Sequence, residues 1–293
     1  MRLFDLHCDT LGEMFRKNEG MHENSLHVSL SKALSVFENY TQVMAIWSEN
    51  DIPDDENYSR CLATLDYAEK HIYGIEGFTP ILAVEGGKLL NYDISRLHVL
   101  AKRGVKIFTP VWKGKSCMGG AYDNEEGLSD FGLEAVRRCF ELGVIPDLSH
   151  SNDKICEQII AISKEYDRPV IASHSCVRRV CPHPRNISDE TAKKVAENGG
   201  VVGVNFVSEH LGGKSTEIIL SHIDALRNLC GEKGVCLGGD LDGMSDSFLP
   251  DCIKNVGDVA VLYDAISKKY HSEDFSDALF YSNARNFAND YLF

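Results

Sequence analysis

The sequence has 293 residues and a formal net charge of −14 at pH 7, from 44 acidic and 30 basic side chains. This balance argues against binding to the phosphate backbone of nucleic acids, which requires clustered lysine and arginine. It also disfavours a polybasic anchor at a membrane surface. The length allows one large domain or two ordinary ones, and the hydrophobic content of 43% is that of a globular protein.

The first residues and the cysteines bear on where the protein works. Charges at Arg2, Asp5 and Asp9 interrupt the apolar stretch that a signal peptide needs, so we expect none. No uncharged run reaches the roughly 20 residues of a membrane span. The 10 cysteines contain no C-x-x-C pair, which fits free thiols in a reducing compartment. The expected location is the cytoplasm, without a membrane or nucleic acid partner.

Short apolar runs alternate with amphipathic stretches along most of the chain. Each run has the length of a buried parallel strand, and most are bounded by glycine, proline or asparagine. The predicted strands are Leu3–Asp9, Gln42–Trp47, Pro80–Glu85, Val105–Val111, Val144–Ser149, Pro169–His174, Val201–Phe206 and Val235–Asp240. Eight strand–helix units in about 250 residues predict an α/β fold, a (β/α)8 TIM barrel, as a single domain over residues 1–293. A doubly wound sheet is the alternative.

Helices are predicted between these strands, at residues 57–72, 131–142, 153–166 and 188–200. In the last of them, Ser188 suits the N-cap and Gly199 suits the stop. Three connections are unusually long or rich in small residues: Met21–Asn39, Lys113–Gly127 and Val177–Ile187. Because the loops after the strands build the active face of a barrel, we expect these three to form substrate walls.

Ionisable side chains stand at or just after the ends of five predicted strands. An unpaired carboxylate buried there would cost several kcal/mol, so these groups need partners. Metal ions suit a set of three imidazoles and three carboxylates. The candidate ligands are His7, Asp9, Glu85, His150, His174 and Asp240.

The spacing of these residues supports a shared site. Side chains two apart on a strand point the same way, so His7 and Asp9 can bind one ion while Cys8 faces outward. Six ligands exceed the three that a single catalytic zinc needs. Two ions about 3.5–4 Å apart that share a carboxylate would use all six.

A single histidine at a strand end is more often structural than a ligand. The common position of the candidates at successive strand ends favours a shared site. The other histidines, among them His183, His210 and His222, lie on predicted helices or loops. For most of these we expect surface or structural roles.

The sequence resembles the membrane (renal) dipeptidase family, zinc-dependent dipeptidases of the metal-dependent hydrolase superfamily. Its landmarks, in order, are DLHCD, VEGG, DLSH, a following SHS, an RN pair and GDLDG. Each motif is weak alone, but their order and spacing are specific. The resemblance implies hydrolysis of small dipeptides, including those with a C-terminal D-residue, by a hydroxide held between two zinc ions.

The resemblance also assigns the ligands. It implies that His7 and Asp9 bind the first zinc ion, that Glu85 bridges both ions, and that His150 and His174 bind the second. Other divalent ions could take the place of zinc. A homodimer is compatible with the resemblance.

The same resemblance implies roles for three further residues. Asp240 would lie beside the metals and transfer protons, which makes it, with Glu85, an expected catalytic group. Asp242 resembles a turn residue more than a ligand. Arg185 matches the arginine that binds the free carboxylate of the substrate, with Arg178 and Arg179 as alternatives.

Two substrate-binding positions depart from the family pattern. Trp112 stands where the family usually carries a histidine, and an indole can donate one hydrogen bond but cannot titrate like an imidazole. Loss of a transition-state donor costs about 3–4 kcal/mol unless another group replaces it. Val207 stands where related enzymes often carry tyrosine. We therefore expect shifted specificity, or else a contact supplied by the Lys113–Gly127 loop.

Two other functions are open. One is a non-catalytic metal or ligand-binding homologue, which the presence of a proton carrier at Asp240 disfavours. The other is a related barrel amidohydrolase with a different substrate. Such enzymes commonly begin with H-x-H and bridge their metals with a modified lysine, whereas Asp9 and Glu85 stand here.

Overall fold

The computed structural model describes residues 1–293, and seven parallel strands form its sheet in the order β5-β4-β3-β2-β1-β7-β6. Every pairing between neighbours is parallel. The strands are β1 (Arg2–Cys8), β2 (Asn39–Trp47), β3 (Phe78–Glu85), β4 (Val105–Thr109), β5 (Ile145–Pro146), β6 (Val202–Val204) and β7 (Val235–Leu237). Seven of the eight predicted strands are therefore present, and the last two of them are β6 and β7.

The predicted strand Pro169–His174 closes the ring between β5 and β6 without forming a regular strand. Parallel bridges join Asp147 to Ile171 and Ala172 to Val202. The barrel prediction is thereby confirmed, but the prediction of a full sixth strand is wrong. The reason is local, because the N–H of Ser173 donates to the side chain of Asp147 at 2.9 Å, where a strand would use a backbone carbonyl.

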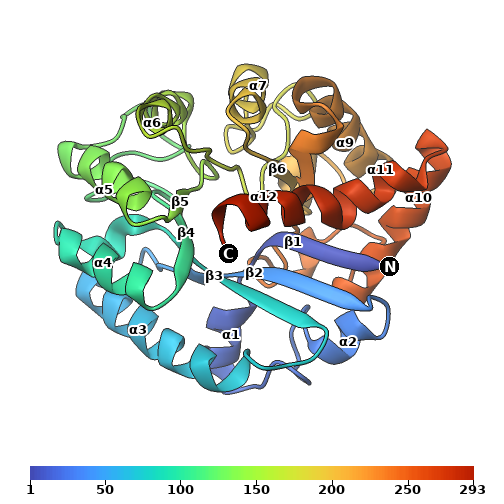
Figure 1. Cartoon of the computed structure of the whole chain (residues 1–293), viewed down its shortest axis with the longest axis horizontal. Helices are drawn as coiled ribbons and strands as arrows, with labels where there is room; N and C mark the ends of the chain where they lie inside the picture. The colour runs from blue at the N-terminus through green and yellow to red at the C-terminus, as the bar shows by residue number, and fades with distance from the viewer.

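Most helices surround the strands on the outside of the barrel, whereas the last one, α12, crosses over the strands (Figure 1). They are α1 (Thr10–Lys17), α2 (Leu30–Leu34), α3 (Asp54–His71), α4 (Ile94–Lys102), α5 (Asp130–Glu141), α6 (Asp153–Glu165), α7 (Asp189–Glu197), α8 (Ser208–Leu211), α9 (Thr216–Cys230), α10 (Ala260–Tyr270), α11 (Glu273–Asp277) and α12 (Asn283–Tyr291). The predicted N-cap of α7 is confirmed, since the Ser188 side chain accepts from the N–H of Thr191. No helix combines the length and the apolar character that a bilayer crossing requires.

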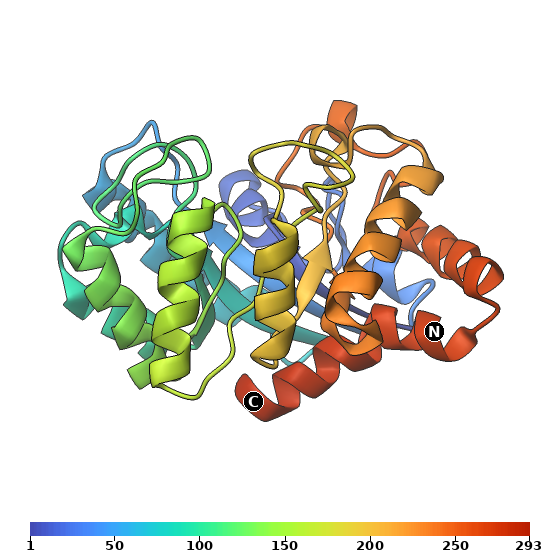
Figure 2. The same ribbon diagram turned by 90° about the horizontal axis from the view of Figure 1, so that it is seen from above.

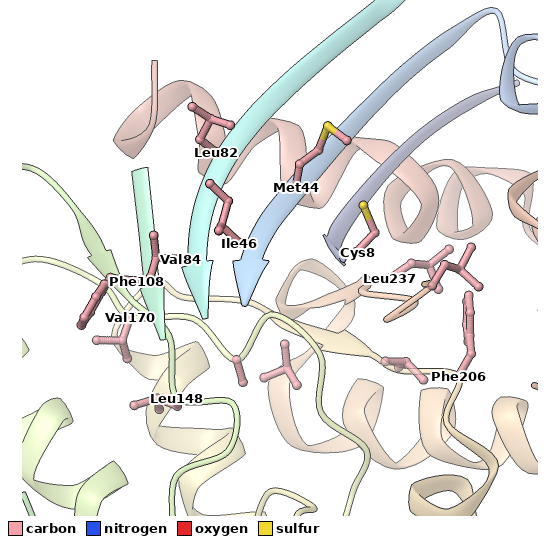
Figure 3. Packing of buried hydrophobic residues seen from close by; sticks show 14 of the residues in the cluster. Cys8, Met44, Ile46, Leu82, Val84, Phe108, Leu148, Val170, Phe206 and Leu237 are labelled. Atoms are coloured by element: carbon pink, nitrogen blue, oxygen red, sulfur yellow. The ribbon is translucent and has the colours of Figure 1, made fainter. Parts of the chain in front are cut away.

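The hydrophobic core has an inner and an outer layer. The outer layer packs strands against helices, and Figure 3 shows Cys8, Met44 and Leu237 within it. The inner layer fills the barrel with side chains such as Phe4 and Leu6, and α12 contributes to it as it crosses the strands (Figure 1). Figure 2 shows many of the longer loops on the side of the molecule opposite α12. The carboxyl ends of the strands are thus left free for a site.

Candidate metal centre and substrate cavity

The six predicted ligands meet at the carboxyl end of the barrel. Glu85, the last residue of β3, has its Oε1 atom 2.7 Å from Nε2 of His150 and 3.3 Å from Nε2 of His174. Its other oxygen, Oε2, lies 3.5 Å from Nε2 of His7. Each oxygen of this carboxylate therefore faces different candidate ligands.

Two further candidate ligands, Asp9 and Asp240, lie around His7. Its Nε2 atom lies 3.5 Å from Oδ2 of Asp9 and 3.8 Å from Oδ1 of Asp240. The donor atoms of these three residues lie within 4.8 Å of one another, and those of His7, Glu85 and His174 do so as well. The structure thus brings together all the residues that the sequence suggested as ligands.

The end of β1 is shaped to present His7. The register of β1 against β2 shifts between Asp5 and Cys8, which interrupts the simple alternation of faces. The carboxylate of Asp5 accepts from the N–H of His7 at 2.9 Å and from the N–H of Gly239 at 3.0 Å. These bonds fix the ends of β1 and β7 beside each other. Cys8 packs in the outer core layer, as expected.

The turn after β7 carries Asp240 into the site. Asp240 and Asp242 both adopt left-handed backbone conformations, with φ of 60° and 66°. A Cβ atom at Gly243 would collide with the carboxylates of Asp9 and Asp240, so only glycine permits this approach. Asp242 lies in the turn, as the sequence suggested, and accepts from the N–H of His27 at 2.6 Å.

Hydrogen bonds orient the imidazoles of His150 and His174. Nδ1 of His150 donates to the backbone carbonyl of Trp112 at 3.1 Å. Nδ1 of His174 donates to the Ser173 hydroxyl at 2.7 Å, and that hydroxyl donates to the carboxylate of Asp147 at 2.6 Å. Each ring therefore carries its hydrogen on Nδ1 and presents a lone pair at Nε2, the arrangement that a metal ligand requires.

The close packing of acceptors is the first sign that cations fit here. The Nε2 atoms of His150 and His174 face each other at 3.1 Å, and both lie near Oε1 of Glu85. Nε2 of His7 and Oδ1 of Asp9 are buried without any hydrogen-bond partner. Such a group costs about 1–3 kcal/mol, so it needs a reason. Bound cations would satisfy all of these atoms, and imidazole with carboxylate is a ligand set that suits zinc.

The pKa values of the cluster show the same conflict. Burial and the nearby carboxylate of Glu85 raise the pKa of Asp9 to about 6. Burial, with Asp9 and Glu85 as neighbours, holds the pKa of Asp240 well above its usual value. Burial opposes the charged form of His7, but the charges of Glu85 and Asp9 outweigh it and raise the pKa of His7 well above its usual value. The carboxylates lie so close together that the charged forms of Asp9 and Asp240 are disfavoured. Bound cations would stabilise these charged forms.

A cavity of about 590 Å³ opens over the cluster. Its lining includes four of the predicted ligands and all three predicted substrate-binding residues, Arg185, Trp112 and Val207. Tyr122 from the Lys113–Gly127 loop also lines it. The loop Met21–Asn39 contributes no lining residue, so its predicted role as a wall of this cavity is wrong. Asp242 and His27 tie that loop to the side of the turn after β7.

Arg185 is held rigidly at the edge of the cavity. Its side chain is only 3% exposed, and it donates from Nη1 to the Ser175 hydroxyl at 3.3 Å and from Nη2 to the carbonyl of His174 at 3.1 Å. The alternatives, Arg178 and Arg179, form ion pairs with aspartates at the starts of α6 and α7 and do not line the cavity. Of the three arginines that the sequence suggested, only Arg185 lines the cavity.

Sequence reasoning missed several lining residues, among them Trp47, Glu209 and His210. His210, which was grouped with the other histidines of helices and loops, borders the cavity three residues after Val207. The available signal was its position in the connection after a predicted strand. His222, by contrast, is buried and bonded on both ring nitrogens, as a structural residue should be.

Comparisons with known proteins bear on the family. The sequence model of the membrane dipeptidase family, peptidase family M19, matches residues 73–285. A protein of Klebsiella pneumoniae known as the uncharacterised protein in the pqqA 5′ region is 31% identical over 194 residues, 61% of this chain and 68% of that protein. Human dipeptidase 3 is 28% identical over 205 residues, 66% of this chain, and the match spans only 41% of the length of dipeptidase 3.

Two solved structures share the fold over the whole chain. The dipeptidase AC, described as a metallopeptidase of family M19, has a TM-score of 0.89 and 24% identity, with 100% of this chain and 99% of that chain covered. A metallopeptidase from Rhodobacter sphaeroides, solved with a phosphinate mimic of the dipeptide L-Ala-D-Ala, has a TM-score of 0.89, 23% identity and the same coverage. With the family match covering most of the sequence, the chain belongs to the membrane dipeptidase family, peptidase family M19, a family of metallo-dipeptidases.

Proposed function

We propose that the protein is a binuclear zinc dipeptidase that hydrolyses the amide bond of small dipeptides, including dipeptides with a C-terminal D-residue. The observation that carries this proposal is the position of Glu85, whose Oε1 lies near Nε2 of His150 and of His174 while its Oε2 lies near Nε2 of His7. In a site for two metal ions, one carboxylate can bind both ions, one with each oxygen.

In this proposal His7 and Asp9 would hold one ion, His150 and His174 would hold the other, and Glu85 would be shared by both. When bound, the two ions would supply a water of lowered pKa as the nucleophile and a Lewis acid for the scissile carbonyl. The buried surroundings of the cluster, with Glu85 only 3% exposed, exclude bulk water and strengthen these interactions.

Asp240 is the proposed proton carrier. Its Oδ1 atom lies 3.8 Å from Nε2 of His7 and its side chain borders the cavity, so it can reach both the ligand cluster and a bound substrate. A carboxyl group so placed can take a proton at Oδ1 and return it to the leaving amine, which is general acid–base catalysis. A binding protein would have no use for this group, which favours the enzyme.

Arg185 is the proposed site for the free carboxylate of the substrate. Its bonds to Ser175 and His174 hold the guanidinium in place and leave further N–H groups for a ligand. A guanidinium matches a carboxylate with two parallel hydrogen bonds. A substrate carboxylate bound by Arg185 would lie near the backbone of His174, which would restrict the substrate to one residue beyond the scissile bond.

Two supporting facts concern substrate and location. The Rhodobacter sphaeroides metallopeptidase of the same fold was solved with a mimic of L-Ala-D-Ala, which supports the inclusion of L-D dipeptides. All ten cysteines of the chain are free thiols, which supports a cytoplasmic site of action.

The test is a panel of L-L and L-D dipeptides given to the zinc-loaded protein, with metal-stripped protein and matched tripeptides as controls. We expect turnover of dipeptides only, and only by the loaded protein. Tight binding of dipeptides without turnover would establish the non-catalytic alternative. Turnover of cyclic amides in place of dipeptides would establish the related amidohydrolase.

A further inference from the structure

We propose that His210 is a specificity-determining residue that donates a hydrogen bond to the free carboxylate of the substrate, beside Arg185. This inference rests on the proposed dipeptidase function and identifies how the same cavity recognises an acid end group. His210 lies in α8 and lines the cavity together with Arg185 and Val207.

The orientation of a neighbouring amide determines which ring nitrogen of His210 carries the hydrogen. Oδ1 of Asn205 accepts from the N–H of Val207 at 3.2 Å and from the thiol of Cys176 at 3.3 Å, so its Nδ2 group must face the other way. Nδ2 lies 3.0 Å from Nδ1 of His210. An amide nitrogen can only donate, so Nδ1 accepts and the hydrogen of the neutral ring is on Nε2.

The Nε2–H group is available to a ligand. No side chain or backbone group of the chain accepts a hydrogen bond from it, and Nε2 is not among the fully buried polar atoms that lack a partner. Since the residue lines the cavity, this donor is accessible from the cavity. It is a fixed donor, because Asn205 holds the opposite edge of the ring.

The ring remains neutral in these surroundings. Burial, reinforced by the positive charge of Arg185 and by the nearby imidazoles of His183 and His150, lowers the pKa of His210 to about 2. His210 therefore adds direction to the recognition of the substrate and adds no charge. Arg185 supplies the charge.

Arg185 and Asn205, the partner of His210, both bond to the same backbone carbonyl. Nη2 of Arg185 donates to the carbonyl of His174 at 3.1 Å, and Nδ2 of Asn205 donates to the same carbonyl at 3.4 Å. The shared carbonyl thus fixes the position of the Arg185 guanidinium relative to the Asn205–His210 pair. A carboxylate has two oxygens and can accept from both donors, whereas an amide offers one oxygen and an N–H2 group that would face a donor.

Tyr122 is a rival for this role. Tyr122 also lines the cavity and carries a hydroxyl that could donate. Its ring centre lies 6.1 Å from that of His150. The phenol lies close enough to Arg185 to influence its charge, so a test of His210 must include a variant of Tyr122.

The experiment uses the zinc-loaded full chain as wild type, His210→Phe, His210→Gln and Tyr122→Phe, with the exposed His22→Ala as a control. Phenylalanine keeps a ring but removes the donor, whereas glutamine keeps an acceptor for Asn205 and a donor for the cavity. We measure kcat and KM for L-Ala-D-Ala and for its C-terminal amide, and the Kd of the phosphinate mimic of L-Ala-D-Ala. Zinc content and the unfolding temperature check that each variant is folded.

We expect His210→Phe to raise KM and Kd for the acids by about tenfold or more, with kcat within about twofold, and to leave the amide unaffected. His210→Gln should remain close to wild type. Equal losses for acid and amide, a loss in kcat alone, or an effect in Tyr122→Phe in place of His210→Phe would overturn the inference. If wild type neither binds nor cleaves the dipeptide, the proposed function fails and this inference with it. If wild type is active and His210→Phe matches it, only this inference fails.

Discussion

The backbone carbonyl of Trp112 accepts a hydrogen bond from Nδ1 of His150 at 3.1 Å. Because this bond uses the main chain, the indole is free to form a wall of the cavity, where it packs against Trp47 with ring centres 4.8 Å apart. The residue that departs from the family pattern thus supports a candidate ligand through its backbone and shapes the substrate site through its side chain.

The first prediction separates these two roles. Trp112→Phe keeps the carbonyl and removes the indole N–H, so we expect zinc content per chain to stay at the wild-type value. The kcat/KM for dipeptides should fall by roughly fivefold, the value of one hydrogen bond. Elemental analysis and steady-state kinetics check this. A loss of zinc would show that the side chain, too, supports the metal centre.

A second prediction concerns the ligands. His150→Ala should retain about half of the zinc of wild type, because the group around His7 keeps its own donors. Glu85→Gln should weaken binding of both ions, since one oxygen of its carboxylate lies near His150 and the other near His7. Zinc per chain after dialysis is the measurement, with His22→Ala as the control. Full retention by His150→Ala would contradict the ligand assignment.

A third prediction concerns the serine that links a buried carboxylate to a ligand. Ser173 accepts from Nδ1 of His174 and donates to Asp147, so Ser173→Ala removes the support of that ring. We expect zinc affinity to fall about 10–100-fold, as for other partners of metal-bound histidines. Competition with a chelator measures this. Ser163→Ala removes a buried serine at α6, away from the cluster, and should leave the affinity unchanged.

The clustering of the candidate ligands could be predicted from the sequence because each stands at or just after the end of a predicted apolar strand, and parallel strands end on one face of a barrel. The fold followed from the same alternation of strands and helices. The place of His210 after a predicted strand was visible in the sequence, but its orientation depends on the short helix α8 and its tautomer on Asn205, and neither could be predicted. The irregular sixth strand could not be predicted for a similar reason, since the N–H of Ser173 bonds to the side chain of Asp147 and not to a backbone carbonyl.

A fourth prediction concerns the substrate carboxylate. Arg185→Ala should raise KM for dipeptides by about 100-fold with a smaller change in kcat, because a charged, two-point contact to the ground state is lost. Arg178→Ala is the matched control, since Arg178 pairs with Asp153 outside the cavity. Steady-state kinetics on L-Ala-D-Ala decide the matter. An unchanged KM would exclude the proposed role.

His222 connects the loops that carry Arg185 and His210. Its Nδ1 accepts from the N–H of Val177 at 3.0 Å, and its Nε2 donates to the carbonyl of Leu211 at 3.0 Å. A backbone N–H can only donate, so the ring must be neutral for both bonds to exist. Burial lowers the pKa of His222 below its usual value, against the smaller effect of the bond to Leu211.

The last prediction is the pH dependence that follows. In the unfolded chain His222 takes up a proton near pH 6.5, whereas in the folded chain it does so only at lower pH. The unfolded state thus binds more protons, so this contribution to stability is complete above pH 6.5 and is lost as the pH falls below it, by up to about 1.4 kcal/mol per pH unit. His222→Gln keeps an acceptor for Val177 and a donor for Leu211 but takes up no proton. Between pH 7.5 and pH 5.5 the free energy of unfolding by urea should therefore fall more steeply for wild type than for His222→Gln, both in the same metal state. Parallel curves for the two proteins would show that His222 is protonated equally in both states, and that its bond to Val177 does not restrict its charge.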